Sequence, residues 1–582
     1  MSKKLTGMNI KPSFFFLVCL LFCVFPGIRA VAQQPVNNYE KEWKQVDEYL
    51  KKELPKSALA QVKIIYQSAK KNNQEAHAIK ALIYMVGLQN ATTENSEAMY
   101  MADIEKEITS TNEPAKSILN SLLAEIYWSY YQQHRWELMD RTNTEGFKKD
   151  DVKTWTPDDF NRKISDLFLQ SIKNSTLLQQ TRLDAYEPII IKGNVRHLRP
   201  TLFDLLVHPA LEYFKNDERD ISKPAYAFEI TDASAFDPAA DFVQHKYNTK
   251  DSGSLQQKAL LLYQQLISFH LHDAKPDALI DLDIERIEFV NEKGVQQNKE
   301  VLYLNALNHI AHQYENLPAA SQAWYLIAQQ YNENASTYEP DGDTTHRYDK
   351  LKAKEICEKI ITQKDSSEGK LNCNNLLNEI NKKDLKFTVE KVNLPGKPSR
   401  VLVQYKNFLQ LHLRIIKADD KLKTELADYY NETFWSRITN TSPLTRWDQD
   451  LPDTKDMQEH SVEIKMDALP SGDYVLLVST DKGFDSKNSL LGAKLFYVSN
   501  ISYLNNGADY FVLHRETGQP MANATVQTWK QKYDYKTSKY IREKSNSYKT
   551  DDRGFFKLDR KVQGSYGESY LLDINYNGER LF

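Results

Sequence analysis

The side chains that could do chemistry in this chain of 582 residues are few, and the cysteines come first. Cys19 and Cys23 lie in an apolar N-terminal stretch, whereas Cys357 and Cys373 lie in two successive segments of helical pattern. A polar turn at residues 365–369 separates these segments, so the later two thiols would face each other across a helical hairpin. Thiols of exported proteins tend to pair. We predict a disulfide between Cys357 and Cys373, with two free buried thiols as the alternative.

Histidines are the second possible source of chemistry. His309 and His312 lie one turn apart on a predicted helix, and His270, His272 and Asp273 cluster at the end of another. Imidazole and carboxylate groups bind metal ions, but the sequence places no further ligand beside either group. We interpret both groups as ordinary surface or core side chains, and we expect no metal and no other cofactor.

Motifs of common enzyme classes are absent from the sequence. It has no His-Glu dipeptide of a zinc-protease helix, no Gly-Lys-Ser/Thr phosphate loop and no Gly-x-Ser-x-Gly elbow. The acidic turn 341–343 lacks the ordered ligands of a calcium loop, and the basic run from Lys382 to Lys386 is typical of a solvated face. We predict that the chain is not an enzyme. An exported hydrolase with a site assembled from scattered residues is the alternative, which catalytic turnover would favour.

The N-terminus has the pattern of an export signal. Lysines precede an apolar run at residues 14–25, and small residues follow at Ala30 and Ala32. We predict that residues 1–32 are a signal peptide cleaved between Ala32 and Gln33. Neither cysteine of the run has the context of a lipoprotein signal, and no later stretch is apolar enough to span a membrane. We therefore expect an exported protein of the periplasm or the cell surface.

Composition and charge narrow the possible partners. The chain has 75 basic and 79 acidic residues and a net charge of -4, so nothing attracts it to nucleic acid. Its 33 Tyr and 24 Phe suit amphipathic contact surfaces or simple packing. At roughly 150 residues per domain, the length predicts about three or four domains.

Residues 33–383 follow a helical period. Apolar residues recur three or four positions apart, as in Leu122, Ile126 and Tyr130, and Thr156-Pro157 is typical of a helix start. The segment from Tyr303 to Ala335 resembles a tetratricopeptide-type helix pair, although no clean repeat of about 34 residues is present. We predict an all-α helical-repeat-like domain over 33–383, with a long polar insertion at 215–254.

Beyond residue 384 the pattern changes to alternation. Short runs of alternating apolar and polar residues, separated by turns rich in Gly, Pro, Asn and Asp, are typical of strands. We predict two macroglobulin-type antiparallel β-sandwich modules, the first over 384–500 and the second over 501–582. The fold class is therefore a multidomain α + β chain, with the helical domain first.

One stretch of the second module carries a specific pattern. A strand at residues 510–513 is followed by Thr-Gly-x-Pro, a small residue and Val, and later by Thr-Asp-x-x-Gly-x-Phe. This order resembles a macroglobulin-type module, and the matching residues are Thr517, Gly518, Pro520, Ala524, Val526, Thr550, Gly554 and Phe556. The earlier stretches VNLPGKP and LPSGDYVLLVS resemble the first macroglobulin domain of large bacterial members. The chain is thus similar to the N-terminal part of a bacterial, Bacteroidetes-type alpha-2-macroglobulin.

This resemblance implies an exported endopeptidase inhibitor with proteases as partners. Such inhibitors trap a protease when it cuts a bait region, and a Cys-Gly-Glu-Gln thioester can then bond the attacker. Here Cys357 is followed by Glu358 and Cys373 by Asn374, so neither cysteine can form that thioester. We expect this chain to lack both the bait region and the thioester, with its second module incomplete at Phe582.

A rival function needs no protease. The helical domain could be the binding part of a cell-envelope scaffold protein, with the β modules only presenting it. Its partner would then be a cell-envelope protein or glycan, and binding by residues 33–383 alone would favour it.

Overall fold

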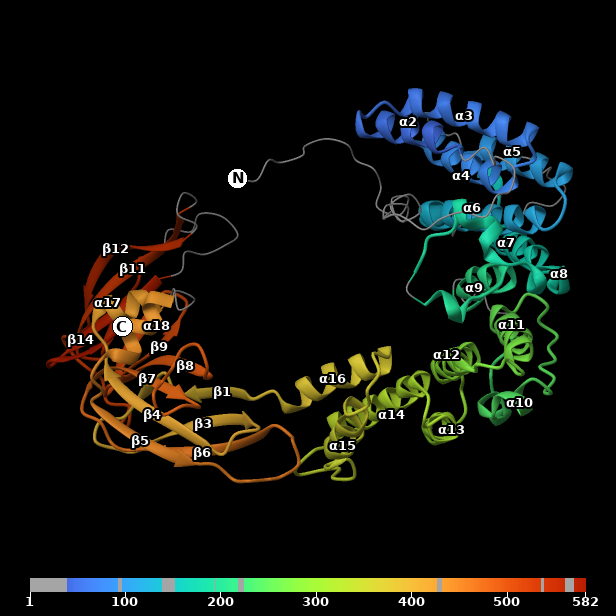
Figure 1. Cartoon of the computed structure of the whole chain (residues 1–582). Coiled ribbons are helices and arrows are strands. Elements are labelled where there is room, and N and C mark those ends of the chain that lie inside the picture. The colour runs from blue at the N-terminus through green and yellow to red at the C-terminus, as the bar shows by residue number, and fades with distance from the viewer. Residues whose placement is uncertain are drawn as a thin grey trace. The chain divides into compact units, whose positions relative to one another are not determined.

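A computed structural model of the chain describes residues 39–92, 97–138, 152–193, 195–217, 225–426, 432–534, 539–559 and 570–582. The predicted signal peptide and its cleavage site between Ala32 and Gln33 lie outside these residues. A helical region is followed by several antiparallel β-sheets, which confirms the predicted fold class (Figure 1). The chain divides into two compact units, one of Met1–Ile327 with Asp365–Gly369 and the other of Ala328–Lys364 with Lys370–Phe582. The predicted domain limits stay predictions.

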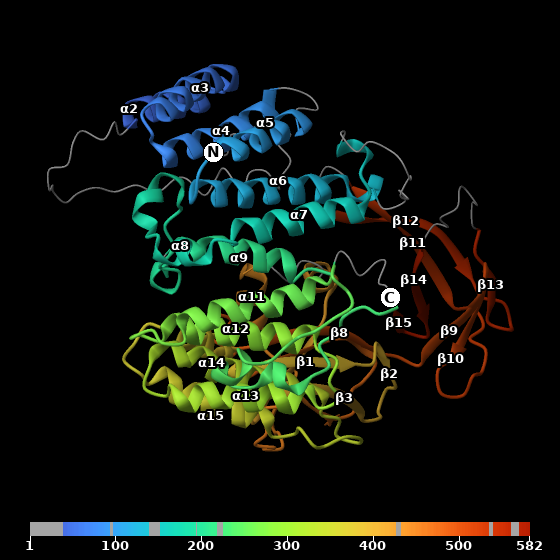
Figure 2. The ribbon, with the colours of Figure 1, turned by 90° about the vertical axis from the view of Figure 1, so that its right-hand side faces the viewer.

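The first unit is built from helices that pack mainly against their neighbours in sequence. Pairs such as α3 with α4, α6 with α7 and α11 with α12 lie side by side in successive layers (Figure 2). The helices are α2 (Glu40–Lys51), α3 (Pro55–Lys71), α4 (Glu75–Thr92), α5 (Glu97–Ser110), α6 (Ala115–Leu138), α7 (Pro157–Ser171), α8 (Ser175–Gln180), α9 (Leu202–Phe214), α10 (Ala239–Phe242), α11 (Leu255–His270), α12 (Asp277–Lys293) and α13 (Lys299–Gln313). Helix α14 (Ser321–Asn334) begins in this unit and ends in the second.

Capping residues fix where two of these helices begin. The Thr156 side chain accepts a hydrogen bond from the Asp159 amide, and the Asp159 carboxylate accepts one from the Thr156 amide. Pro157 occupies the first turn, where its missing N–H is not needed. The helix start predicted at Thr156-Pro157 is therefore confirmed. Thr201 and Asp204 repeat the same capping box at the start of α9.

A buried arginine holds the described part of the predicted insertion, which contains η5 (Ala233–Phe236) and α10. Arg286 of α12 is fully buried and donates to the Asp283 carboxylate and to the carbonyl oxygens of Ala235 and Asp237. A buried guanidinium is stable only when its donors are satisfied in this way. The insertion thus carries an ordered segment that is attached to the helical core.

In the second unit, the end of α14 is followed by two further helices and then by a first β module. Helices α15 (Asp349–Ile361) and α16 (Glu368–Asn381) precede β1 (Asp384–Val389), β2 (Val392–Asn393), β3 (Ser399–Lys406), β4 (Gln410–Lys417), β5 (Thr445–Asp450), β6 (His460–Met466), β7 (Gly472–Ser479) and β8 (Leu491–Val498). The sheets β1-β3-β6 and β2-β8-β7-β4-β5 enclose one apolar core between them. Among the described ladders, only the two-residue pairing of β2 with β8 is parallel.

Two short helices interrupt this module, and the alternation pattern did not predict them. Helices α17 (Asp420–Glu425) and α18 (Glu432–Asn440) lie between β4 and β5. Phe434 and Ile438 are one helical turn apart, and they bury against Val475 and Leu477 on the outer face of the sheet. The five-stranded sheet is therefore covered on both faces, which explains why β7 reads as a continuous apolar run.

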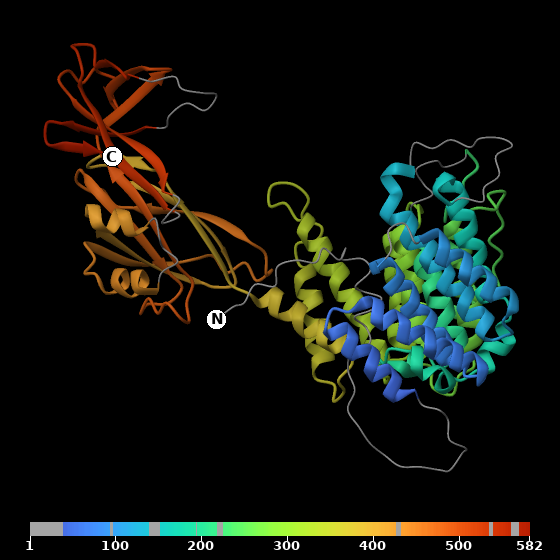
Figure 3. The ribbon, with the colours of Figure 1, turned by 90° about the horizontal axis from the view of Figure 1, so that it is seen from above.

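The second β module has its own core. Its strands are β9 (Ile501–Asn506), β10 (Asp509–His514), β11 (Thr525–Asp534), β12 (Lys539–Lys549), β13 (Phe555–Lys557), β14 (Tyr570–Tyr576) and β15 (Glu579–Leu581). They form the antiparallel sheets β13-β10-β9 and β12-β11-β14-β15, with apolar residues of both sheets in one cluster. Figure 3 shows the orange strands of the first module and the red strands of the second as neighbouring stacks.

Candidate functional site

The residues of the Thr-Gly-x-Pro motif form a tight turn after β10. The Gly518 amide donates to the His514 carbonyl at 2.8 Å, and the His514 amide donates to the Gln519 carbonyl at 2.8 Å. Gly518 has a φ of +70°, which an L side chain adopts only with strain. Pro520 then pairs with Leu513 of β10, and the Thr517 hydroxyl accepts from the Gln519 amide. These residues reverse the chain beside its own strand.

Thr550 joins this turn to the start of β11. Its hydroxyl is buried, donates to the Met521 carbonyl at 2.6 Å and accepts from the Ala524 amide at 2.8 Å. The Thr550 amide also donates to the Ala524 carbonyl. Ala524 is fully buried, as is Val526, which enters the apolar core from β11. One hydroxyl therefore satisfies two backbone groups that would otherwise be buried without a partner.

Gly554 and Phe556 complete the same corner. Gly554 has a φ of +71°, and a Cβ built on it would lie 2.3 Å from the Val512 carbonyl oxygen. Its own carbonyl accepts from the Val512 amide at 2.8 Å, so the two backbones are in direct contact. The Phe556 ring stacks on Tyr510 with centroids 5.1 Å apart. The structure thus places the eight motif residues in the turn after β10, at the start of β11 and in the turn into β13, where they position these strands.

Cys357 of α15 and Cys373 of α16 do face each other, as the sequence predicted. Both are buried and both are free thiols, so the predicted disulfide is not formed in the structure. Their side chains hydrogen-bond to each other, and this bond together with burial raises the pKa of the Cys373 thiol well above its usual range. The structure thus has the two free buried thiols that the sequence analysis gave as the alternative, and the disulfide stays a prediction.

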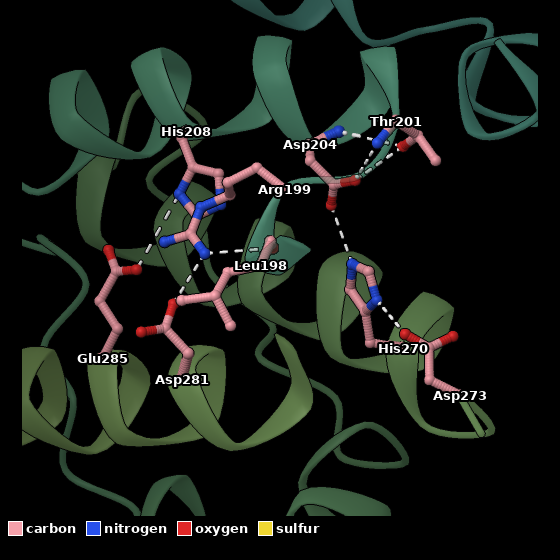
Figure 4. Close-up of polar contacts among 9 residues, drawn as sticks. All are labelled: Leu198, Arg199, Thr201, Asp204, His208, His270, Asp273, Asp281 and Glu285. Carbon is pink, nitrogen blue, oxygen red and sulfur yellow. Dashed lines mark hydrogen bonds and ion pairs between the residues drawn. The ribbon is translucent and has the colours of Figure 1, made fainter. Parts of the chain in front are cut away.

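A buried polar network links α9 to α11 in the first unit (Figure 4). The carboxylate of Asp204 accepts from the Thr201 hydroxyl and amide on one oxygen and meets His270 Nε2 at 2.8 Å on the other. His270 Nδ1 lies 2.6 Å from the Asp273 carboxylate. His270 is 1 % exposed and Asp204 is completely buried. Both ring nitrogens thus face carboxylates, which is the environment of an imidazolium ion.

A second part of the network joins α9, α11 and α12. Glu285 accepts from the Tyr263 hydroxyl at 3.1 Å and from Lys215 Nζ at 3.0 Å, and His208 Nδ1 lies 4.0 Å from the same carboxylate. Arg199 forms an ion pair of 2.7 Å with Asp281 beside it (Figure 4). These groups come from segments far apart in sequence. They hold neighbouring helices together.

The two histidines of the network have opposite pKa shifts. Burial lowers the pKa of His270, but its hydrogen bonds to Asp204 and Asp273 outweigh burial and raise the pKa overall. Burial, followed by the charge of Arg199, lowers the pKa of His208 to about 4. His270 is therefore held in its charged form and His208 in its neutral form. No nucleophile lies beside either ring among the described residues, so this network is a clamp between helices.

The sequence grouping of His270, His272 and Asp273 was therefore only partly right. His272 is exposed, and the true partner of His270 is Asp204, which is distant in sequence. The only local signal for Asp204 was the spacing of Thr201 and Asp204, which predicts a capping box. His312 contacts the ring of Trp324, and His309 is exposed. Within the described ranges, no three His, Cys, Asp or Glu side chains are arranged to hold a metal ion.

Among the comparisons with known proteins, matches come from the solved structures. No protein-family model matches the chain, and no curated protein matches it. The crystal structure of native alpha-2-macroglobulin from Escherichia coli, spanning domains MG0-NIE-MG1, is similar with 14 % identity and a TM-score of 0.24. The match covers 34 % of this chain and 62 % of that one. Among the described helices, none is long and apolar enough to cross a membrane.

Proposed function

We propose that this chain is an exported protein of the alpha-2-macroglobulin type and that it acts on endopeptidases as an inhibitor. The observation that supports this function is the corner formed by the eight motif residues of the second β module. They span positions 517–556 and build the turn after β10, the start of β11 and the turn into β13, where the Gly554 backbone contacts that of Val512. A residue pattern that builds a specific corner is a stronger basis for a resemblance than matching composition.

The mode of inhibition follows from what the sequence contains. The 582 residues include no Cys-Gly-Glu-Gln, and the inhibition that we propose for them uses no thioester. It is steric, with the β modules lying against the endopeptidase and the helical unit serving as a docking surface or spacer. A steric inhibitor blocks large protein substrates more strongly than short peptides, because short peptides still reach the catalytic groups.

A binding experiment tests this function. The exported chain is mixed with an endopeptidase whose active site is blocked covalently, and the mixture is separated by size-exclusion chromatography. We expect the two proteins to elute together, whereas serum albumin in place of the chain leaves the endopeptidase at its own elution volume. Separate elution with serine, cysteine and metallo-endopeptidases alike would contradict the proposal.

A second function is favoured by one specific observation, a pocket of about 220 Å³ among α4, α5 and α6 of the helical unit. A cell-envelope binding or scaffold protein would use such a pocket and would have no effect on proteases. In either function we place the chain in the periplasm or at the cell surface, which fractionation of the producing cells tests. Binding of the chain to an endopeptidase supports the first function. Binding to an envelope component, without binding to any endopeptidase, supports the second.

A further inference from the structure

The pocket among α4, α5 and α6 has an unusual lining. Tyr100 of α5 and Tyr130 of α6 are buried, and Trp128 of α6 lies beside them at the pocket wall. Glu97 and Glu125 contribute two carboxylates. The three helices pack against one another (Figure 2) and belong to one compact unit. Their side chains line the pocket.

Helix periodicity places the α6 side of this lining on one stripe. Glu125, Ser129 and Gln133 are spaced four residues apart and share a face with Leu122 and Ile126. Glu125 interrupts an apolar run that otherwise packs as core. A carboxylate at such a position lowers stability unless a partner offsets its burial.

No such partner is present in the described part of the chain. Neither Glu125 nor Glu97 forms an ion pair or a side-chain hydrogen bond with a described residue, and the Tyr100 hydroxyl also has no partner there. Burial alone raises the pKa of Glu125 to about 7. By contrast, Glu285 of the same unit is also buried but has Lys215 and Tyr263 as partners, and its pKa is lowered. Among the described residues, Glu125 therefore lacks the positive charge that Lys215 supplies to Glu285.

The aromatic rings are fixed by contacts outside the pocket. Trp128 stacks on Tyr131 and makes an edge contact with Tyr213, with centroids 5.6 Å and 5.1 Å apart. Tyr130 stacks on Phe160 at 5.7 Å. Rings held in place present their negative π faces without a further entropy cost, and such faces attract alkylammonium groups.

We propose that this pocket binds an alkylammonium group, with Glu125 as its counter-ion and Tyr100, Trp128 and Tyr130 as the surrounding aromatic wall. A volume of about 220 Å³ is smaller than the roughly 300 Å³ at which pockets for drug-sized ligands begin, and it suits one aliphatic chain with a charged end. The ammonium group comes either from a small free amine or from a lysine side chain of a partner. This inference does not depend on the proposed inhibition.

The protonation state of the Glu125 carboxyl group determines how binding depends on pH. Glu125 must be ionised to hold a cation, and it is largely protonated below its pKa of about 7. Glu97 of α5 adds a second carboxylate, whereas Tyr100 stays neutral because burial raises its pKa. The ring of His134 also lies near the pocket, with its centroid 4.4 Å from that of Tyr130. Affinity for an alkylammonium group therefore increases from pH 6 to pH 8.

Titration calorimetry of the exported chain tests the site. The probes are cadaverine, Nα-acetyl-lysine methylamide and, as the uncharged control, 1,5-pentanediol. We expect at least one ammonium probe to bind at pH 8, about tenfold more tightly than at pH 6, and pentanediol not to bind. Binding of cadaverine alone identifies a free amine as the natural ligand, and binding of the lysine derivative identifies a partner's lysine.

Substitutions show whether Glu125 carries the binding. Glu125→Gln keeps the size of the side chain and removes its charge, and we expect it to weaken binding at least about tenfold, which corresponds to about 1.4 kcal/mol. Glu48→Gln removes an exposed charge from α2 and leaves binding unchanged. The site is contradicted if no ammonium probe binds the wild-type chain at millimolar concentration, or if E125Q binds as well as wild type. Circular dichroism of E125Q shows whether it folds.

Discussion

The helical unit and the second β module satisfy their buried polar groups in different ways. In the helical unit, side chains far apart in sequence pair with each other, as in His270 with Asp204 and Arg286 with the carbonyls of Ala235 and Asp237. In the β module, turns satisfy the buried polar groups through backbone contacts, as at Gly554, and through the hydroxyl of Thr550. Long-range pairs leave almost no local trace in a sequence, whereas turns demand particular residues at fixed spacing. This difference explains why the family resemblance is specific only in the β half.

The largest effect should come from breaking the long-range pair in the helical unit. Asp204→Asn removes the charge that faces the buried His270, and we expect it to lower the free energy of unfolding by about 3–5 kcal/mol. The raised pKa of His270 means that its stabilising contribution is fully present below its unfolded pKa of about 6.5 and is lost as pH rises through its folded value. Urea unfolding at pH 6 and pH 9 should therefore show the larger loss at pH 6.

Asp281→Asn is the matched control for this substitution. Asp281 pairs with Arg199 near the same helices, but both side chains are about a third exposed. Solvent screens such a pair, so we expect a change within about 1 kcal/mol. Equal losses from D204N and D281N would contradict the role given to the buried pair.

The next effect concerns the hairpin of α15 and α16. We predict that export oxidises Cys357 and Cys373 to a disulfide, with two electrons and two protons passing to a disulfide-bearing oxidant. A loop of this length stabilises the folded chain by about 3 kcal/mol. Protein purified from the export compartment should show no reactive thiol after denaturation without reductant and two after reduction. Two reactive thiols before reduction would show that the pair stays free.

The corner of the second β module should depend on one glycine. Gly554→Ala adds a Cβ that meets the Val512 carbonyl and also strains a positive φ, so we expect a loss of about 2–3 kcal/mol. Gly518→Ala strains a similar φ but meets no atom within 4 Å, and it should cost about 1 kcal/mol. Urea unfolding that gives the same loss for both variants would show that the backbone contact at Gly554 is unimportant.

The smallest effect is a gain in stability. Burial raises the pKa of Glu125 to about 7, so ionising this carboxyl costs the folded state progressively more between its usual pKa of 4.5 and pH 7. Glu125→Gln stays neutral, so in the absence of ligand we expect it to be more stable than wild type by about 1–2 kcal/mol at pH 8 and equally stable at pH 4. Thermal unfolding at both pH values measures this. A loss of stability at pH 8 would mean that Glu125 has a structural partner.

Some of this architecture was predictable from sequence, and the reasons are physical. The start of α7 at Thr156-Pro157 was predicted because capping is local, and alternating strands such as β3 were predicted because one face is buried. Helices α17 and α18 were missed because their two turns of apolar spacing are too short to stand out among strands. The partner of His270 and the pocket at Glu125 were missed because they depend on the packing of separate helices.

The most direct test of the proposed function compares two substrates of one endopeptidase. The exported chain is titrated into the active enzyme, and hydrolysis of casein and of a short chromogenic peptide is followed side by side. We predict that casein hydrolysis falls as the chain approaches equimolar amounts while peptide hydrolysis stays nearly constant. Equal hydrolysis of casein with and without the chain, by serine, cysteine and metallo-endopeptidases alike, would contradict inhibition and leave the helical unit as the binding part of an envelope protein.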